Sequence, residues 1–116
     1  MDLIKQFENY CINWEDKINE NEWFFEEFVE LITKNLTQTD AYNLISDAVK
    51  LVLIQSDKYL CYETLLLLFD IIRISDTTEI PQLLNNEWDN LFNHISHFSK
   101  GHIKIFNDIK EWYRII

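Results

Sequence analysis

The sequence has almost none of the residues that make tight turns. Gly101 is the one glycine and Pro81 the one proline among 116 residues. Sheet proteins place turn residues about every 8–12 positions, so this shortage excludes a fold built from many short strands. Proteins that cradle phosphates use glycine-rich loops, because the backbone must approach the ligand closely. The sequence therefore also excludes a phosphate-binding loop of that kind.

Basic residues are scarce as well. The chain has ten lysines and arginines against twenty aspartates and glutamates, which gives a net charge of −10 at pH 7. A protein that follows a nucleic-acid backbone neutralises its phosphates with lysine and arginine. We therefore predict no nucleic-acid binding. A large negative charge is typical of a protein that attracts a basic partner.

Cysteines and long apolar runs are also few. Cys11 and Cys61 are the two cysteines, and both are predicted to be small, reduced core residues instead of parts of a disulfide framework. The longest apolar run ends at Asp70 and is too short to cross a bilayer. The start of the chain, MDLIK, does not resemble a secretory signal. We expect a cytoplasmic protein with no membrane partner.

What the sequence does contain is apolar side chains at helical spacing. Apolar residues make up 47% of the chain, enough for a folded core despite the high charge. We predict an all-α fold in one domain, residues 1–116. Apolar spacing is regular over residues 2–18, 25–36, 44–52, 58–75, 84–98 and 105–116, and each predicted helix contains one of these stretches and can begin before it, at a capping residue.

Polar residues that can cap a helix precede four of the six predicted helices. They are Asn19 in the pattern Asn-x-x-Glu, Thr37 in the pattern Thr-x-x-Asp, the pair Ser56-Asp57, and Thr78. The stretch 99–101 is expected to turn the chain into the last helix. Short connections make successive helices antiparallel neighbours. We therefore predict three stacked helical hairpins, as a bundle or a short HEAT-like stack.

The helix predicted at residues 58–75 is apolar nearly all round. Its polar strip consists of Glu63, Asp70 and Arg73. A helix of this kind must be covered on several sides, so we expect it at the centre of the fold. Leu66 and Phe69 are expected to be buried there.

Motifs that carry chemistry are missing from the sequence. It has no G-x-S-x-G, no H-E-x-x-H and no Cys-x-x-Cys. His94 and His97 are spaced so that both could bind a metal, but no acid or cysteine stands where it would complete the site. We expect His94, His97 and His102 to be surface residues. No catalytic residue, metal or cofactor is predicted, and the protein is not expected to be an enzyme.

Acidic residues concentrate at the start of the chain. Residues 1–30 hold nine acids and two bases, a net of −7. Glu22, Glu26 and Glu30 recur every four residues, a spacing at which like charges destabilise a helix by a few tenths of a kcal/mol. Glutamates that destabilise a helix and are still present indicate a functional role, and binding a basic partner is one such role. The same pattern is also typical of an ordinary solvated face.

Trp23 lies among these carboxylates on the predicted helix. On a helical wheel it falls between Glu27 and Glu30, opposite Phe25. Tryptophan is enriched among the residues that dominate protein interfaces. The predicted partner-binding residues are therefore Glu22, Trp23, Glu26, Glu27 and Glu30. The alternative is that Trp23 folds back and packs over the preceding loop.

One segment resembles a known family. An apolar helix from Leu65 to Ile74 is followed by the sequence DTTEIP at residues 76–81 and by another amphipathic helix. This pattern, over about residues 57–98, resembles the small helical immunity proteins of bacterial polymorphic-toxin and contact-dependent inhibition systems. Their toxin-contacting residues differ from pair to pair, so none is carried over to this sequence.

The resemblance implies a small, acidic, cytoplasmic bacterial protein that neutralises a cognate toxin domain by tight binding. A toxin that cuts nucleic acid carries a basic cleft, which an acidic face could cover. Two other functions remain open at this point. A HEAT-like adaptor would show an exposed apolar groove for a protein or peptide partner. An enzyme would show a deep pocket with perturbed acids.

Overall fold

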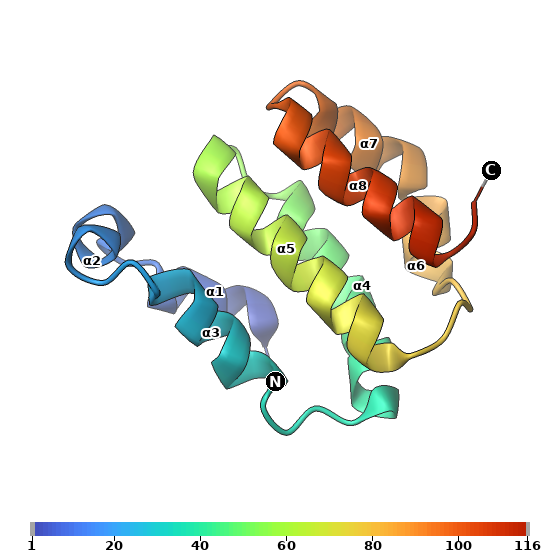
Figure 1. Cartoon of the computed structure of the whole chain (residues 1–116), viewed down its shortest axis with the longest axis horizontal. Helices are drawn as coiled ribbons and strands as arrows, with labels where there is room; N and C mark the ends of the chain where they lie inside the picture. The colour runs from blue at the N-terminus through green and yellow to red at the C-terminus, as the bar shows by residue number, and fades with distance from the viewer. Residues whose placement is uncertain (1, 116) are drawn as a thin grey trace. The chain divides into compact units, whose positions relative to one another are not determined.

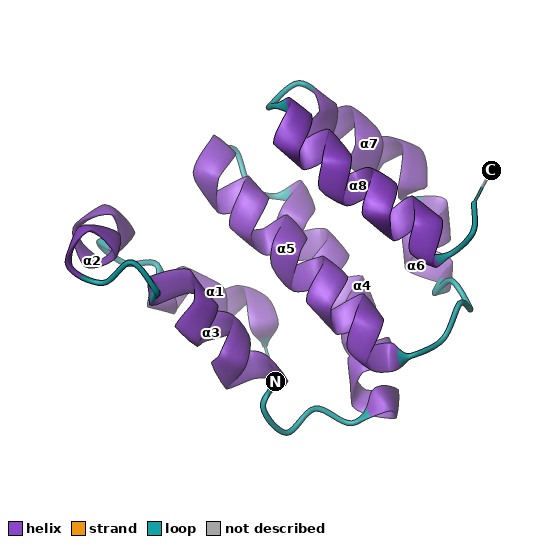
Figure 2. Cartoon of the chain, viewed as in Figure 1, coloured by secondary structure: helices purple, strands orange, loops and turns teal. Residues whose placement is uncertain are grey.

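The computed structural model describes residues 2–115, so Met1 and Ile116, the last residue of the last predicted helix, lie outside it. Within this range every regular element is a helix (Figure 2), and the predicted all-α fold class is confirmed. Eight helices are present in the described residues, so the prediction of six in three hairpins is not confirmed. They are α1 (Leu3–Tyr10), α2 (Trp14–Glu20), α3 (Phe24–Thr33), α4 (Gln38–Leu53), α5 (Lys58–Ser75), α6 (Gln82–Asn86), α7 (Trp88–Ser96) and α8 (Lys100–Trp112).

The first predicted helix is interrupted near its middle. It is divided into α1 and α2, and Asn13 between them has a left-handed backbone with φ of 58°. Asparagine is one of the few residues that adopt this conformation readily, because its short polar side chain bonds locally. The apolar spacing continues across the break, and for that reason the periodicity alone predicts one helix.

The fifth predicted helix begins later than expected and is also divided. Thr78 does not cap it, since Pro81 is the residue that precedes α6. A residue before proline is disfavoured in helical conformation, so Ile80 prevents a helix from starting at Thr78. Glu87 then separates α6 from α7.

Two of the four predicted caps are confirmed, and Asn19 is wrong as Thr78 is. Thr37 Oγ1 accepts a hydrogen bond of 3.1 Å from the Asp40 amide at the start of α4. Asp57 Oδ1 accepts one of 2.9 Å from the Leu60 amide at the start of α5. Asn19, however, lies inside α2 and does not begin the next helix.

The described helices belong to two compact units, one in residues 1–36 with α1 to α3 and one in residues 37–116 with α4 to α8. Figure 1 colours the first unit blue to cyan and the second green to red. The single domain predicted from the sequence stays a prediction. Each unit is described by itself below.

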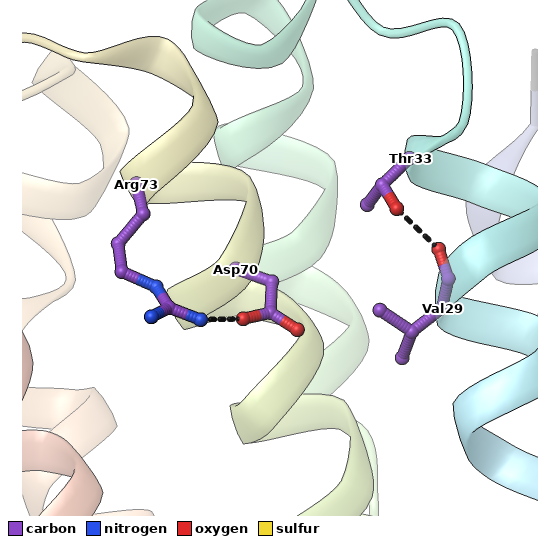
Figure 3. Close-up of polar contacts among 4 residues, drawn as sticks. All are labelled: Val29, Thr33, Asp70 and Arg73. Carbon is purple, nitrogen blue, oxygen red and sulfur yellow. Dashed lines mark hydrogen bonds and ion pairs between the residues drawn. The ribbon is translucent and has the colours of Figure 1, made fainter.

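Aromatic rings form much of the core of the first unit. Phe7 on α1 meets Phe28 on α3 edge to face, with ring centroids 5.5 Å apart. Tyr10 stacks on Phe24 at 4.4 Å, and its hydroxyl donates a hydrogen bond of 2.6 Å to the Phe24 carbonyl. Such ring pairs stabilise beyond the burial of their area. At the other end of α3, Thr33 Oγ1 donates to the Val29 carbonyl at 2.8 Å (Figure 3).

The second unit is built around α5, which packs against α4 on one side and α8 on another (Figure 1). The helices α7 and α8 also pack together. Leu68 on α5, Leu91 on α7 and Ile109 on α8 are fully buried. The helices α5 and α8 run in the same direction: His102 bonds Lys58 where both begin, and Trp112 bonds Thr77 where both end. The central position predicted for this helix is therefore observed within its own unit.

Two core residues predicted on α5 are placed differently by the structure. Leu66 and Phe69 are half-buried, whereas Leu65 and Leu68 next to them are completely buried. The polar strip explains the difference, because Arg73 pairs with Asp70 (Figure 3) and also lies over the Phe69 ring, 4.9 Å from its centroid. Phe69 therefore lies beside the solvated strip and not in the core.

Candidate partner-binding face

The predicted partner-binding residues lie in α3 and in the turn just before it, and all five are exposed. The opposite side of α3 is buried through Phe24, Phe25, Phe28 and Ile32. Burying one side of the helix leaves the other to solvent, as the apolar spacing requires. We call the exposed set, Glu22, Trp23, Glu26, Glu27 and Glu30, the acidic face.

Trp23 is 59% exposed, so the alternative in which it packs over the preceding loop is not observed. Leu31 is 66% exposed and lies eight residues further along the chain. At 1.5 Å per residue, eight residues correspond to roughly 12 Å along a helix. The sequence prediction did not include Leu31, although its spacing from Trp23 and Glu27 (eight and four residues) places all three on one side.

Asn21 fixes the turn that carries Trp23. Its Oδ1 accepts a hydrogen bond of 3.1 Å from the Trp23 amide, and its Nδ2 donates one of 3.1 Å to Glu27 Oε2. The Glu27 amide in turn donates to the Trp23 carbonyl at 2.9 Å. This small network joins the tryptophan to the first turn of α3 and sets the direction of the acidic face.

Three of the four carboxylates of the acidic face lie where the helix dipole favours negative charge. Glu26 and Glu27 lie in the first turn of α3, and Glu22 lies in the turn before it. Negative side chains near a helix amino terminus are stabilised by the helix dipole, typically by about 0.3–1 kcal/mol each. The like-charge cost inferred from the sequence assumed a helix that includes Glu22. The inference is therefore wrong for Glu22 and Glu26, and it still applies to Glu26 and Glu30, which both lie in α3.

The carboxylate of Glu27 also acts on its own unit. Burial raises the pKa of the Tyr10 hydroxyl, and the nearby Glu27 carboxylate raises it further. Tyr10 therefore keeps its proton at neutral pH and remains a donor to the Phe24 carbonyl. The acidic face and the aromatic core beneath it are electrostatically linked.

The three histidines are not all at the surface, as the sequence had predicted. His97 is exposed and His94 half-buried, but His102 is only 1% exposed, so the prediction is wrong for His102. Its ring bonds a residue 44 positions earlier, which no local pattern reveals. Within residues 2–115, no three histidine, cysteine or acidic side chains are grouped so that they could hold a metal.

Cys61 is buried, as predicted, and Cys11 is half-buried. Burial raises the pKa of each thiol to about 12, so both remain protonated at neutral pH. Protonated thiols are poor nucleophiles and poor metal ligands. The described cysteines therefore add no reactive group to either unit.

None of the helices in the described range is both long and apolar enough to span a membrane. Comparison with known proteins identified no similar one: no family model matches the sequence, and neither a curated protein nor a solved structure matches it. The resemblance to immunity proteins therefore depends on the pattern at residues 57–98 alone. A proposal about function therefore depends on which residues are exposed and how they are arranged.

Proposed function

We propose that this chain is an immunity protein that binds a cognate bacterial toxin domain through the acidic face and neutralises it. The observation that carries the proposal is the exposure of Trp23 among four exposed glutamates on one side of α3. Tryptophan is highly buried on average in proteins, and it is enriched among the residues that dominate binding. The proposal requires no chemical step by this protein.

The partner that fits this face is basic and has an apolar depression. Lysine and arginine side chains on the toxin would pair with Glu22, Glu26, Glu27 and Glu30, while the indole of Trp23 fills the depression. A nuclease domain offers such a surface, because its cleft must attract phosphates. Covering that cleft would exclude the substrate by steric and electrostatic occlusion.

The charge distribution also favours rapid association. Residues 1–30 carry a net charge of −7, and the remaining 86 residues a net of −3. A negative field concentrated on one unit steers a basic protein during diffusional encounter. A toxin inside the producing cell must be captured quickly, so a high association rate suits the proposed function.

Substitutions on the acidic face should weaken the complex with the basic toxin domain encoded beside this gene. Trp23→Ala should cost about 2 kcal/mol or more of binding free energy, because it removes the proposed anchor. Glu26→Lys together with Glu27→Lys should chiefly slow association, and raised salt should slow the natural protein in the same way. Surface plasmon resonance measures both rates, and survival of cells that co-express the toxin measures protection.

Two controls separate the acidic face from general effects. Ile54→Ala removes an exposed apolar side chain (55% exposed) in the second unit. Glu79→Lys with Asp89→Lys changes the net charge by the same amount at exposed positions of the second unit. If the controls weaken binding as much as the acidic-face variants do, the face is not the interface. Unchanged binding in every variant would show that the toxin domain is bound through another surface.

A further inference from the structure

A pocket of about 360 Å³ lies in the second unit, at the amino-terminal ends of α5 and α8. It is lined by Asp57, Lys58, Tyr59, Tyr62, Ser99 and His102. Its volume is within the range of small-molecule sites, and two tyrosine rings supply apolar wall. The proposed toxin interface lies in the first unit, so this pocket is a separate feature of the molecule.

Ser99 and His102 form a hydrogen-bonded pair in this pocket. Ser99 Oγ lies 2.6 Å from His102 Nδ1, and His102 Nε2 lies 3.0 Å from the Lys58 carbonyl oxygen. A carbonyl oxygen can only accept, so in the neutral ring Nε2 carries the proton and donates it there. Nδ1 is then left as the acceptor, and the Ser99 hydroxyl donates to it. This is the arrangement in which a histidine serves as the base for a serine nucleophile.

The surroundings keep the ring of His102 in its basic form. His102 is 1% exposed, with Phe98 stacked at 5.2 Å and Tyr62 edge-on at 5.3 Å. Burial lowers the pKa of His102, and the positive charge of Lys58 and the His94 ring lower it further, while the bond to the Lys58 carbonyl opposes them. Asp57, Tyr59 and Tyr62 are the other titratable groups that line the pocket. The imidazole is therefore neutral at pH 7 and able to accept a proton.

Gly101 leaves open the space beside the Ser99 hydroxyl that a larger residue would partly fill. A Cβ added to Gly101 would lie 3.5 Å from Ser99 Oγ and 3.4 Å from the Tyr62 ring. The one glycine of the sequence thus leaves space next to the hydroxyl. The first turn of α8 follows Ser99 directly, and amides in a first turn have no acceptor within the helix.

We propose that Ser99 and His102 are the nucleophile and the base of an acyl-transfer site that takes a small, uncharged ester in this pocket. Ser99 Oγ forms a bond to the ester carbonyl carbon as His102 Nδ1 takes the hydroxyl proton. The bond from that carbon to the alcohol oxygen then breaks, and the leaving alcohol receives the proton from His102. Water then forms a bond to the acyl carbon as His102 Nδ1 takes one of its protons. The bond from that carbon to Ser99 Oγ breaks, Oγ receives the proton from His102, and a carboxylic acid is released.

The test uses the full-length protein and a serine-directed probe, an alkyl fluorophosphonate. Ser99 should displace fluoride and gain the phosphonyl group, detected as one adduct by intact-mass and peptide mass spectrometry. Ser99→Asn should abolish the adduct, while asparagine keeps the capping role at the start of α8. The matched control Ser96→Ala removes a hydroxyl that bonds the Asn93 carbonyl, and it should leave labelling unchanged.

His102→Gln should lower the labelling rate by about 10²-fold or more, the usual effect of removing a general base. If that variant does not fold, the pH profile of the natural protein serves instead: labelling should persist at the ordinary histidine pKa of about 6.5 and be lost only at lower pH, because burial lowers the pKa of His102. Hydrolysis of p-nitrophenyl acetate should show the same dependence on Ser99. No adduct on Ser99, labelling only of tyrosines, or equal labelling in His102→Gln would overturn the proposal.

Discussion

At the scale of single residues, His102 links stability to pH through its burial. The ring is almost completely covered, and burial lowers its pKa in the folded chain. In the unfolded chain a histidine has a pKa of about 6.5. Below that pH the unfolded chain takes up a proton before the folded chain does, so the free energy of unfolding falls. The free energy of unfolding stops falling once the pH is below the pKa of His102 in the folded chain.

We therefore expect the natural protein to lose stability as the pH is lowered from 7.5 to 5.5. Urea denaturation followed by circular dichroism should show a falling midpoint over this range, which lies above the ordinary pKa of carboxylates. In His102→Gln most of this dependence should disappear. His97→Gln is the matched control, because His97 is exposed, and it should keep the pH dependence. An unchanged slope in His102→Gln would show that another group responds to pH.

Single residues also show how far the sequence can predict a site. The exposure of Trp23 follows from its own helix, since Phe25, Phe28 and Ile32 determine which side of α3 is buried. His102 could not be predicted in this way, because its partner carbonyl belongs to Lys58, 44 positions earlier. Ser99 and His102 do leave a local signal, a Ser-x-x-His pattern at a helix start. The pattern does not by itself indicate a site, because serine at a helix start is commonly just a capping residue.

At the scale of elements, α5 makes a sharp test of the core. Leu68 is fully buried and Leu66 is half-buried, two positions apart on one helix. Leu68→Ala should lower the free energy of unfolding by about 2–5 kcal/mol, the range for emptying a buried leucine. Leu66→Ala should cost less, because part of its surface is already in water. Urea denaturation midpoints with equal slopes give both values, and equal losses would contradict the placement of these two residues.

The elements themselves were predicted where apolar spacing and capping agree. Thr37 and Asp57 begin α4 and α5 as expected, because each accepts a hydrogen bond from the third amide along. The interruptions at Asn13 and Glu87 were missed, since apolar side chains continue in phase on both sides of each. A left-handed residue such as Asn13 breaks the hydrogen-bond ladder without disturbing the pattern of buried positions. Periodicity therefore predicts which face is buried more reliably than it predicts where a helix ends.

At the scale of the whole molecule, the two units differ in what they contain. The second unit has long helices packed on both sides of α5, with many side chains completely buried. The first unit has three helices of at most ten residues, held largely by aromatic rings. Chains below about 40 residues rarely bury enough surface to fold alone. The two units are therefore expected to differ in independent stability.

Residues 37–116 produced alone should keep a helical far-ultraviolet spectrum and melt in one cooperative transition. Residues 1–36 produced alone should show weak helicity and no cooperative melting. Differential scanning calorimetry and circular dichroism on the two fragments and on the full chain test this directly. If residues 37–116 are unfolded in isolation, the chain is one cooperative domain, as the sequence analysis predicted.

The exposure of Trp23 has an optical consequence. Trp14, Trp88 and Trp112 are half-buried, whereas the indole of Trp23 faces water among carboxylates. We therefore expect its fluorescence to lie furthest to the red of the four and to be the most open to collisional quenchers. The negative charges around it draw in caesium ions and repel iodide, so the two quenchers act unequally on this ring. The surface that we propose for toxin binding thus carries its own fluorescent label. A partner bound there would reduce the difference between quenching by caesium and quenching by iodide.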